Sequence, residues 1–173
     1  TMVGTGYVGL VTGVCFSNTG NDVLCLDVDP AKIEKLRRGV CPIYEPGLEE
    51  LMERNTKAGR LRFTLDKVEA YRDADMIFIC VGTPSDERGH TDLRYVNSAA
   101  DDIADVLMSL GPSQKPKVIV MKSTVPVGTT FSVRDRIRAR VGSAIPFTVA
   151  DNPEFLKEGD AISDFNKPDR VVV

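Results

Sequence analysis

The chain has 173 residues, of which 42% are hydrophobic and 27% are charged, and its formal net charge is −3. This length suits one domain with a substantial buried core. The acidic balance argues against nucleic acid or an anionic membrane as the main partner. No apolar stretch approaches the roughly 20 residues that a membrane span needs. Cys25 and Cys80 lie inside apolar runs, as small buried residues in a reducing compartment do, so we expect a cytoplasmic protein.

Apolar runs that favour strands alternate with helical patterns along the chain. The runs 76–81 and 118–121 are apolar without alternation, which is typical of strands covered on both faces. The predicted strands are residues 1–4, 23–27, 61–64, 75–81, 117–121 and 147–150, and the predicted helices lie near 7–19, 30–38, 47–58, 66–71, 93–110 and 129–141. This order predicts an α/β fold, a doubly wound, mostly parallel, Rossmann-like sheet in a single domain.

A glycine pattern follows the first predicted strand. Gly4, Gly6 and Gly9 form G-x-G-x-x-G, which is typical of a turn that binds a dinucleotide. Gly4 permits the tight turn, Gly6 lets a pyrophosphate approach the backbone, and Gly9 lets the next helix pack closely on the sheet. Backbone N–H groups at the start of that helix then bind the anion.

An acidic residue closes the second apolar run. Asp27 is placed to accept hydrogen bonds from both ribose hydroxyls of a dinucleotide. A 2′-phosphate beside this carboxylate would be repelled. The pattern therefore predicts NAD rather than NADP. The alternative interpretation of Asp27 is that it is a solvated turn residue at a strand end.

Both chain ends lie in apolar runs. Only three residues precede Gly4, whereas strands usually have about 5–6 residues, and the last residues are the run 170–173. We expect a fragment of a longer protein, truncated at both ends.

Three further loops follow predicted strands at the edge where ligands bind in open α/β sheets. Residues 82–85 and 122–128 carry hydroxyls and prolines, and residues 151–159 carry two carboxylates and a lysine. If the last segment is helical, Glu154 and Glu158 share one face, while Lys157 points elsewhere and is available to an anion. Each loop alone is a plausible turn, but the three together beside the glycine pattern predict a functional site.

Seven segments are spread in order along the whole chain: 3–10, 27–29 with Lys32, 42–48, 81–84, 122–128, 152–159 and 164–173. Together they resemble the UDP-glucose/GDP-mannose dehydrogenase family. The tail 164–173 is most similar to the UDP-glucose branch.

The resemblance implies an enzyme that oxidises a sugar C6 alcohol to a carboxylate with two NAD. It assigns the pyrophosphate to Gly4, Gly6, Tyr7, Val8 and Gly9. It also assigns the adenosine end to Asp27 and Lys32, and the nicotinamide half to Thr83 and Thr124.

The same resemblance assigns the UDP-sugar to one segment, which comprises Glu154, Phe155, Leu156, Lys157 and Glu158. Glu158 would also touch NAD. Thr124 and Glu154 are the candidate catalytic residues, which position the hydrolytic water and transfer protons. A UDP-glucose substrate and a homodimer of the full-length protein are implied as partners.

In this family the second oxidation passes through a covalent thiohemiacetal and a thioester, so it needs an activated cysteine. That cysteine lies in a downstream Gly-Gly-x-Cys-x-Pro-Lys-Asp segment. Cys15, Cys25, Cys41 and Cys80 lack this setting and also lack metal-ligand spacing. We therefore expect no metal site, and a fragment that is inactive alone. The central helix and the C-terminal UDP-binding domain would lie outside residues 1–173.

The sequence also allows other functions. The GDP-mannose branch shares every cofactor argument. A non-catalytic nucleotide-sensing module and an S-adenosylmethionine-binding fold are alternatives from other classes, and the latter also places an acid after its second strand. Asp151 stands where a serine is common in the family, and His90, the only histidine, is expected in a surface loop.

Overall fold

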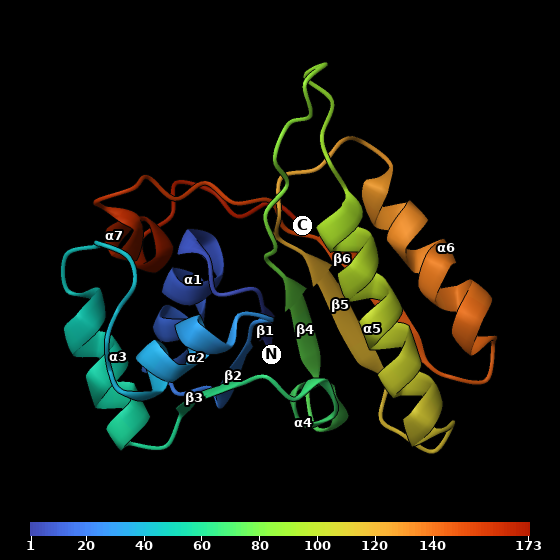
Figure 1. Ribbon diagram of the computed structural model, residues 1–173, viewed down its shortest axis with the longest axis horizontal. Helices are drawn as coiled ribbons and strands as arrows, with labels where there is room; N and C mark the ends of the chain where they lie inside the picture. The colour runs from blue at the N-terminus through green and yellow to red at the C-terminus, as the bar shows by residue number, and fades with distance from the viewer.

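A computed structural model describes residues 1–173 and shows six strands in one parallel sheet (Figure 1). The strands are β1 (Met2–Val3), β2 (Val23–Leu26), β3 (Leu61–Thr64), β4 (Met76–Ile79), β5 (Lys117–Met121) and β6 (Phe147–Asp151). Their order in the sheet is β3-β2-β1-β4-β5-β6. Strand order therefore switches between β1 and β4, and the predicted doubly wound α/β fold is confirmed.

Helices cover both faces of this sheet (Figure 1). On one face lie α1 (Tyr7–Asn18), α2 (Pro30–Arg37) and α3 (Leu48–Lys57), and on the other α4 (Lys67–Arg72), α5 (Arg94–Leu110) and α6 (Thr129–Val141). The predicted helices agree with these bounds to within one or two residues. The predicted first and fourth strands are longer than β1 and β4, because the strand ends continue into the turns that carry the site.

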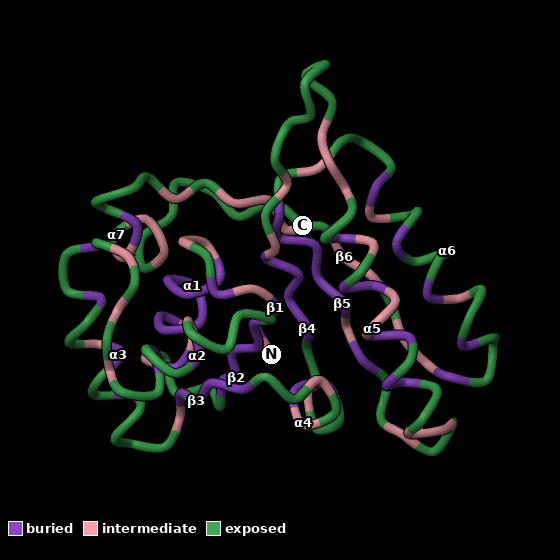
Figure 2. The backbone as a smooth tube through the Cα atoms, in the orientation of Figure 1, coloured by how far each residue is buried: buried purple, intermediate pink, exposed green.

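Alternate side chains of each strand enter two separate cores. In β1, Met2 packs in the core beneath α1, and Val3 packs in the core beneath α5. In β4, Phe78 faces the first core, while Ile77 and Ile79 face the second. The central strands are buried on both faces, whereas the loops at their carboxyl ends are largely exposed (Figure 2). This burial explains the apolar runs without alternation.

A short seventh helix, α7 (Ala161–Asn166), was not predicted from the sequence. It lies beside α1 (Figure 1). There the Phe165 ring packs edge-on against the Phe16 ring, with 5.1 Å between the ring centroids. Asp160 precedes the helix without capping it through its side chain. Helix α4 is equally short, but the Asp66 side chain caps its start; α7 lacks such a cap, so packing on α1 determines this helix.

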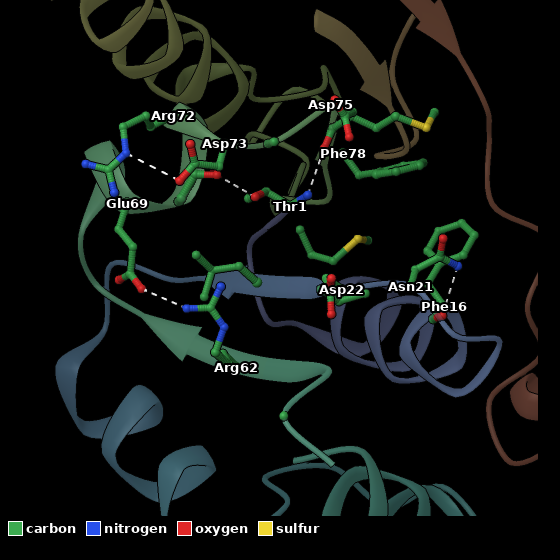
Figure 3. A pocket seen from close by; sticks show the side chains of 17 residues that line it. Thr1, Phe16, Asn21, Asp22, Arg62, Glu69, Arg72, Asp73, Asp75 and Phe78 are labelled. Carbon is green, nitrogen blue, oxygen red and sulfur yellow. Dashed lines mark hydrogen bonds and ion pairs between the residues drawn. The ribbon is translucent and has the colours of Figure 1, made fainter. Parts of the chain in front are cut away.

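A hollow of about 900 Å³ lies at the amino-terminal edge of the sheet (Figure 3). Its lining includes Thr1, Asp75 and an ion pair between Arg62 and Glu69. Ligands of open α/β sheets bind at the opposite, carboxyl edge, so this hollow is separate from the candidate site. No helix is both long enough and apolar enough to cross a membrane.

Candidate functional site

The glycine loop between β1 and α1 has the geometry that the sequence predicted. Gly4 has φ +96°, and a Cβ there would lie 2.9 Å from the Cys80 carbonyl oxygen. A Cβ on Gly9 would lie 2.0 Å from the Gly4 carbonyl oxygen, so only glycine allows α1 to start this close to the turn. By contrast, a Cβ on Gly6 would have no protein atom within 4 Å. The space beside Gly6 is therefore free of protein atoms, and the missing side chain leaves it available to a ligand.

The first turn of α1 faces the same open space. No side chain caps the helix, and no acidic residue lies in its first turn. The first backbone bond of the helix runs from the Leu10 N–H to the Gly6 carbonyl at 2.9 Å. The N–H groups before Leu10, in the turn that contains Tyr7 and Val8, therefore have no partner within the helix. Such a helix end binds phosphate.

Asp27 lies at the carboxyl end of β2, beside the glycine loop, and is 8% exposed. Its Oδ2 accepts from the Thr5 N–H at 2.8 Å, the Thr5 hydroxyl at 2.6 Å and the Lys32 ammonium at 2.9 Å. Its Oδ1 accepts only from the Asp29 N–H at 3.1 Å. Oδ1 thus keeps capacity for a ribose hydroxyl, since each carboxylate oxygen accepts about two hydrogen bonds.

These contacts also fix the charge of Asp27. Burial alone raises the pKa of this carboxyl, but hydrogen bonds from Thr5, Lys32 and Asp29 more than offset burial and lower the pKa to about 2. The group is therefore ionised at neutral pH. The open backbone at Gly6, the uncapped helix and the ionised Asp27 together fit a dinucleotide with a free 2′-hydroxyl.

Thr83 and Thr124 come together at the ends of neighbouring strands. Thr83 follows β4 and Thr124 follows β5, and the Thr83 hydroxyl donates to the Thr124 carbonyl at 2.9 Å. The neighbouring Ser123 hydroxyl donates to the Val81 carbonyl at 2.7 Å. These bonds hold the loops after β4 and β5 together at the carboxyl edge of the sheet.

Glu154 lies beyond the end of β6 and is held from two sides. Its Oε1 accepts from the N–H groups of Phe155 at 2.8 Å and Leu156 at 3.1 Å. Its Oε2 lies 2.8 Å from the Lys122 ammonium, and this buried oxygen makes no hydrogen bond of regular geometry. Lys122 also donates to the Asn152 side-chain oxygen at 3.1 Å. The carboxylate is therefore oriented by its neighbours, and Oε2 keeps unused capacity to accept a hydrogen bond.

The segment that follows Glu154 is an irregular loop rather than a helix. Glu154 and Glu158 consequently do not share a helical face: Glu154 is largely covered, whereas Glu158 is exposed. Pro153 and the exposed Gly159, with φ +90°, favour the irregular backbone. Lys157 is exposed, but it is not free for an anion as the sequence suggested, because its ammonium lies 3.4 Å from an Asp164 carboxylate oxygen.

The sequence did not assign roles to three residues that hold this site. Thr5 anchors Asp27, Lys122 pairs with Glu154, and Glu45 bonds the Tyr7 hydroxyl. All three residues lie in segments that carry the family resemblance, 3–10, 42–48 and 122–128, and that was the available signal. The glycine pattern itself gave no signal for Thr5, which occupies one of its variable positions.

Residues 1–173 match the model of the UDP-glucose/GDP-mannose dehydrogenase family, NAD binding domain. The chain belongs to this family. It is 51% identical to a UDP-glucose 6-dehydrogenase of Rhizobium meliloti over 174 residues, which are all of this chain and 38% of that protein. As a member of this family's NAD-binding domain, the chain uses NAD as its cofactor, in agreement with the prediction from Asp27.

Solved structures of nucleotide-sugar dehydrogenases share the fold. A UDP-glucose dehydrogenase from Pyrobaculum islandicum is 45% identical with a TM-score of 0.91, and the match covers 98% of this chain and 38% of that one. A GDP-mannose dehydrogenase from Pseudomonas aeruginosa is 38% identical with a TM-score of 0.92, over 98% of this chain and 39% of that one. The chain thus spans about two fifths of the length of the relatives that it matches.

Proposed function

We propose that this chain is the N-terminal NAD-binding part of a UDP-glucose 6-dehydrogenase, which oxidises UDP-glucose to UDP-glucuronate in two NAD-dependent steps. The observation that carries the proposal is the place of Glu154, which lies beyond β6 with its Oε2 paired to Lys122. This carboxylate stands at the same edge of the sheet as the dinucleotide loop, where a sugar alcohol would meet the cofactor. The 51% identity to a UDP-glucose 6-dehydrogenase supports the same substrate.

The cofactor roles follow the geometry. The loop from Gly4 to Gly9, with Tyr7 and Val8, would hold the pyrophosphate at the start of α1. Asp27 would bind the adenosine ribose, with Lys32 beside it. Thr83 and Thr124 would line the nicotinamide half. NAD, when bound, supplies the acceptor for the hydride that leaves C6.

The sugar roles fall on the loop after β6. The segment 154–158, with Phe155, Leu156 and Lys157, would bind the UDP-sugar, and Glu158 would also touch NAD. Glu154, which is paired with Lys122, would accept the proton of the C6 hydroxyl, directly or through a water. Thr124 would position the water that hydrolyses the intermediate. The chain thus supplies a base and a positioned hydroxyl for the reaction.

The activated cysteine of the second oxidation is proposed to lie outside residues 1–173, with the central helix, the UDP-binding domain and the homodimer contacts. Burial raises the pKa of Cys15, Cys25 and Cys80 to about 12, which keeps these thiols protonated. Burial also raises the pKa of Cys41, the remaining cysteine. We therefore expect no turnover of UDP-glucose by residues 1–173 alone, and measurable turnover by this fragment would contradict that.

The test of the function uses the purified full-length protein with NAD and each of two nucleotide sugars. We expect UDP-glucose to yield two NADH per UDP-glucuronate formed, with little turnover of GDP-mannose. GDP-mannose 6-dehydrogenase is the second candidate, because the fold matches the Pseudomonas aeruginosa GDP-mannose dehydrogenase at a TM-score of 0.92. A preference for GDP-mannose in turnover and in calorimetric binding would favour that enzyme.

A further inference from the structure

Glu45 is a buried carboxylate that joins three segments distant in the sequence. It lies in the loop between α2 and α3 and is 6% exposed. Its Oε2 accepts from the Tyr7 hydroxyl and from the Gly159 N–H at 2.8 Å. Its Oε1 accepts from the N–H groups of Ala161 at 2.8 Å and Ile162 at 3.4 Å. One side chain therefore connects the dinucleotide loop to the start of α7.

All partners of this carboxylate are hydrogen-bond donors. Burial alone raises the pKa of Glu45, but the bonds from Tyr7, Gly159, Ile162 and Ala161 more than offset burial and hold the pKa below its usual value. Burial and the Glu45 contact raise the pKa of Tyr7 to about 12, so the Tyr7 hydroxyl remains a donor. A neutral amide at position 45 would direct an N–H group at one of these donors.

Of the segments that Glu45 joins, the one before α7 depends on it most. Helix α1 is anchored in the core through Leu10, Val11 and Val14, which are each 0% exposed. Residues 157–160 are exposed, and the Gly159 N–H bonds only to Glu45 and, at 3.1 Å, to the Tyr7 hydroxyl oxygen. Loss of the carboxylate would therefore displace the segment around Gly159 and leave α1 in place.

We infer that Glu45 is a positioning residue for the segment proposed to bind the sugar. By accepting a hydrogen bond from the Gly159 backbone N–H, it holds residues 157–160 beside Tyr7 of the dinucleotide loop. The inference rests on the proposed function, which assigns residues 154–158 to the UDP-sugar. Glu45 itself is 6% exposed and acts through Gly159 rather than by touching the sugar. It would thus keep the sugar at a fixed place relative to the cofactor.

The test is Glu45→Gln in the full-length protein, which keeps the size of the side chain and removes its charge. We expect the KM for UDP-glucose to rise about tenfold or more, the scale of one lost hydrogen bond to a charged group. The Kd for NAD without sugar should stay within about twofold, because α1 keeps its core packing. Glu49→Gln is the matched control, since it makes the same change at an exposed position in the first turn of α3.

A substrate-independent measurement accompanies the kinetics. Hydrogen exchange of the Gly159 and Ala161 amides should accelerate about tenfold in Glu45→Gln and stay unchanged in Glu49→Gln. Tyr7→Phe removes the partner hydroxyl, so the double variant should raise KM by less than the product of the single effects. If Glu45→Gln fails to fold, Tyr7→Phe tests the inference with the same two measurements. An unchanged KM and an unchanged Gly159 exchange rate in that variant would contradict it.

Two results would overturn the inference. One is an unchanged KM and exchange rate in Glu45→Gln; the other is a lower thermal stability together with a rise in the NAD Kd as large as the rise in KM. The second pattern would mean a general structural role. The proposed function fails separately, if the wild-type protein does not oxidise UDP-glucose. Faster exchange in Glu45→Gln would then still show that the carboxylate holds the segment.

Discussion

Lys122 and Glu154 form an ion pair across the ends of β5 and β6, with 2.8 Å between Nζ and Oε2. The two side chains are only 8% and 12% exposed. Neighbouring parallel strands place them together, because the carboxyl ends of β5 and β6 meet at one edge of the sheet. The proposed proton acceptor therefore lies directly beside the Lys122 side chain.

Replacement of Lys122 by Met should destabilise the domain, because it leaves the buried carboxylate of Glu154 without its cation. Removal of one partner of a buried pair costs about 3–5 kcal/mol. Urea unfolding of the full-length protein measures the change. The double variant Lys122→Met with Glu154→Gln removes both charges and should recover most of the loss. A double variant no more stable than Lys122→Met would show that the pairing contributes little.

Alanine substitutions at two glycines should separate cofactor binding from folding. Gly6→Ala places its Cβ in open space, so we expect unchanged thermal stability and an NAD Kd raised about tenfold or more. Gly9→Ala places its Cβ 2.0 Å from the Gly4 carbonyl oxygen, so it should destabilise the domain by about 1–3 kcal/mol or more. Calorimetry gives both quantities. Normal NAD affinity in a folded Gly6→Ala protein would exclude a pyrophosphate at this loop.

Stability at acid pH should depend on Asp27. Its pKa is lowered from 3.8 to about 2 in the folded protein. A group with a depressed folded pKa stabilises the fold above its unfolded pKa, and this contribution is lost as pH falls from about 4 to 2. The contribution is about 2 kcal/mol. We expect Asp27→Asn to lose less stability over this range than the wild type, measured by urea unfolding at each pH. Parallel pH profiles would contradict the assignment.

The cysteines of this domain should be unreactive in the folded protein. Cys15, Cys25 and Cys80 are buried, and burial raises the pKa of each to about 12. Alkylation at neutral pH should therefore be slow until the protein is unfolded. Mass spectrometry after a timed exposure to iodoacetamide locates the labelled residues.

Cys41→Ala in the full-length protein should leave the second oxidation intact, and loss of that step alone would make Cys41 the nucleophile.

Local sequence patterns predicted most of the fold, since six strands and six of the seven helices were found close to their observed bounds. The glycine loop was also predictable, because the requirements at Gly4 and Gly9 come from backbone contacts within one turn and its neighbouring strand. The prediction failed for α7 and for the loop from Glu154 to Glu158. Those segments lack a periodic apolar pattern, and their conformation depends on Phe16, Glu45 and Lys122 from elsewhere in the chain.

The sequence by itself determined the parallel sheet, the dinucleotide turn and the choice of NAD, because periodicity, glycine spacing and a carboxylate at a strand end act over short distances. Only the tertiary structure decided which groups hold the carboxylates of the site. Glu45 reaches Gly159 across 114 positions and Tyr7 across 38. A carboxylate accepts from any donor within reach, so its partners follow from strand order and loop placement rather than from neighbours in the chain.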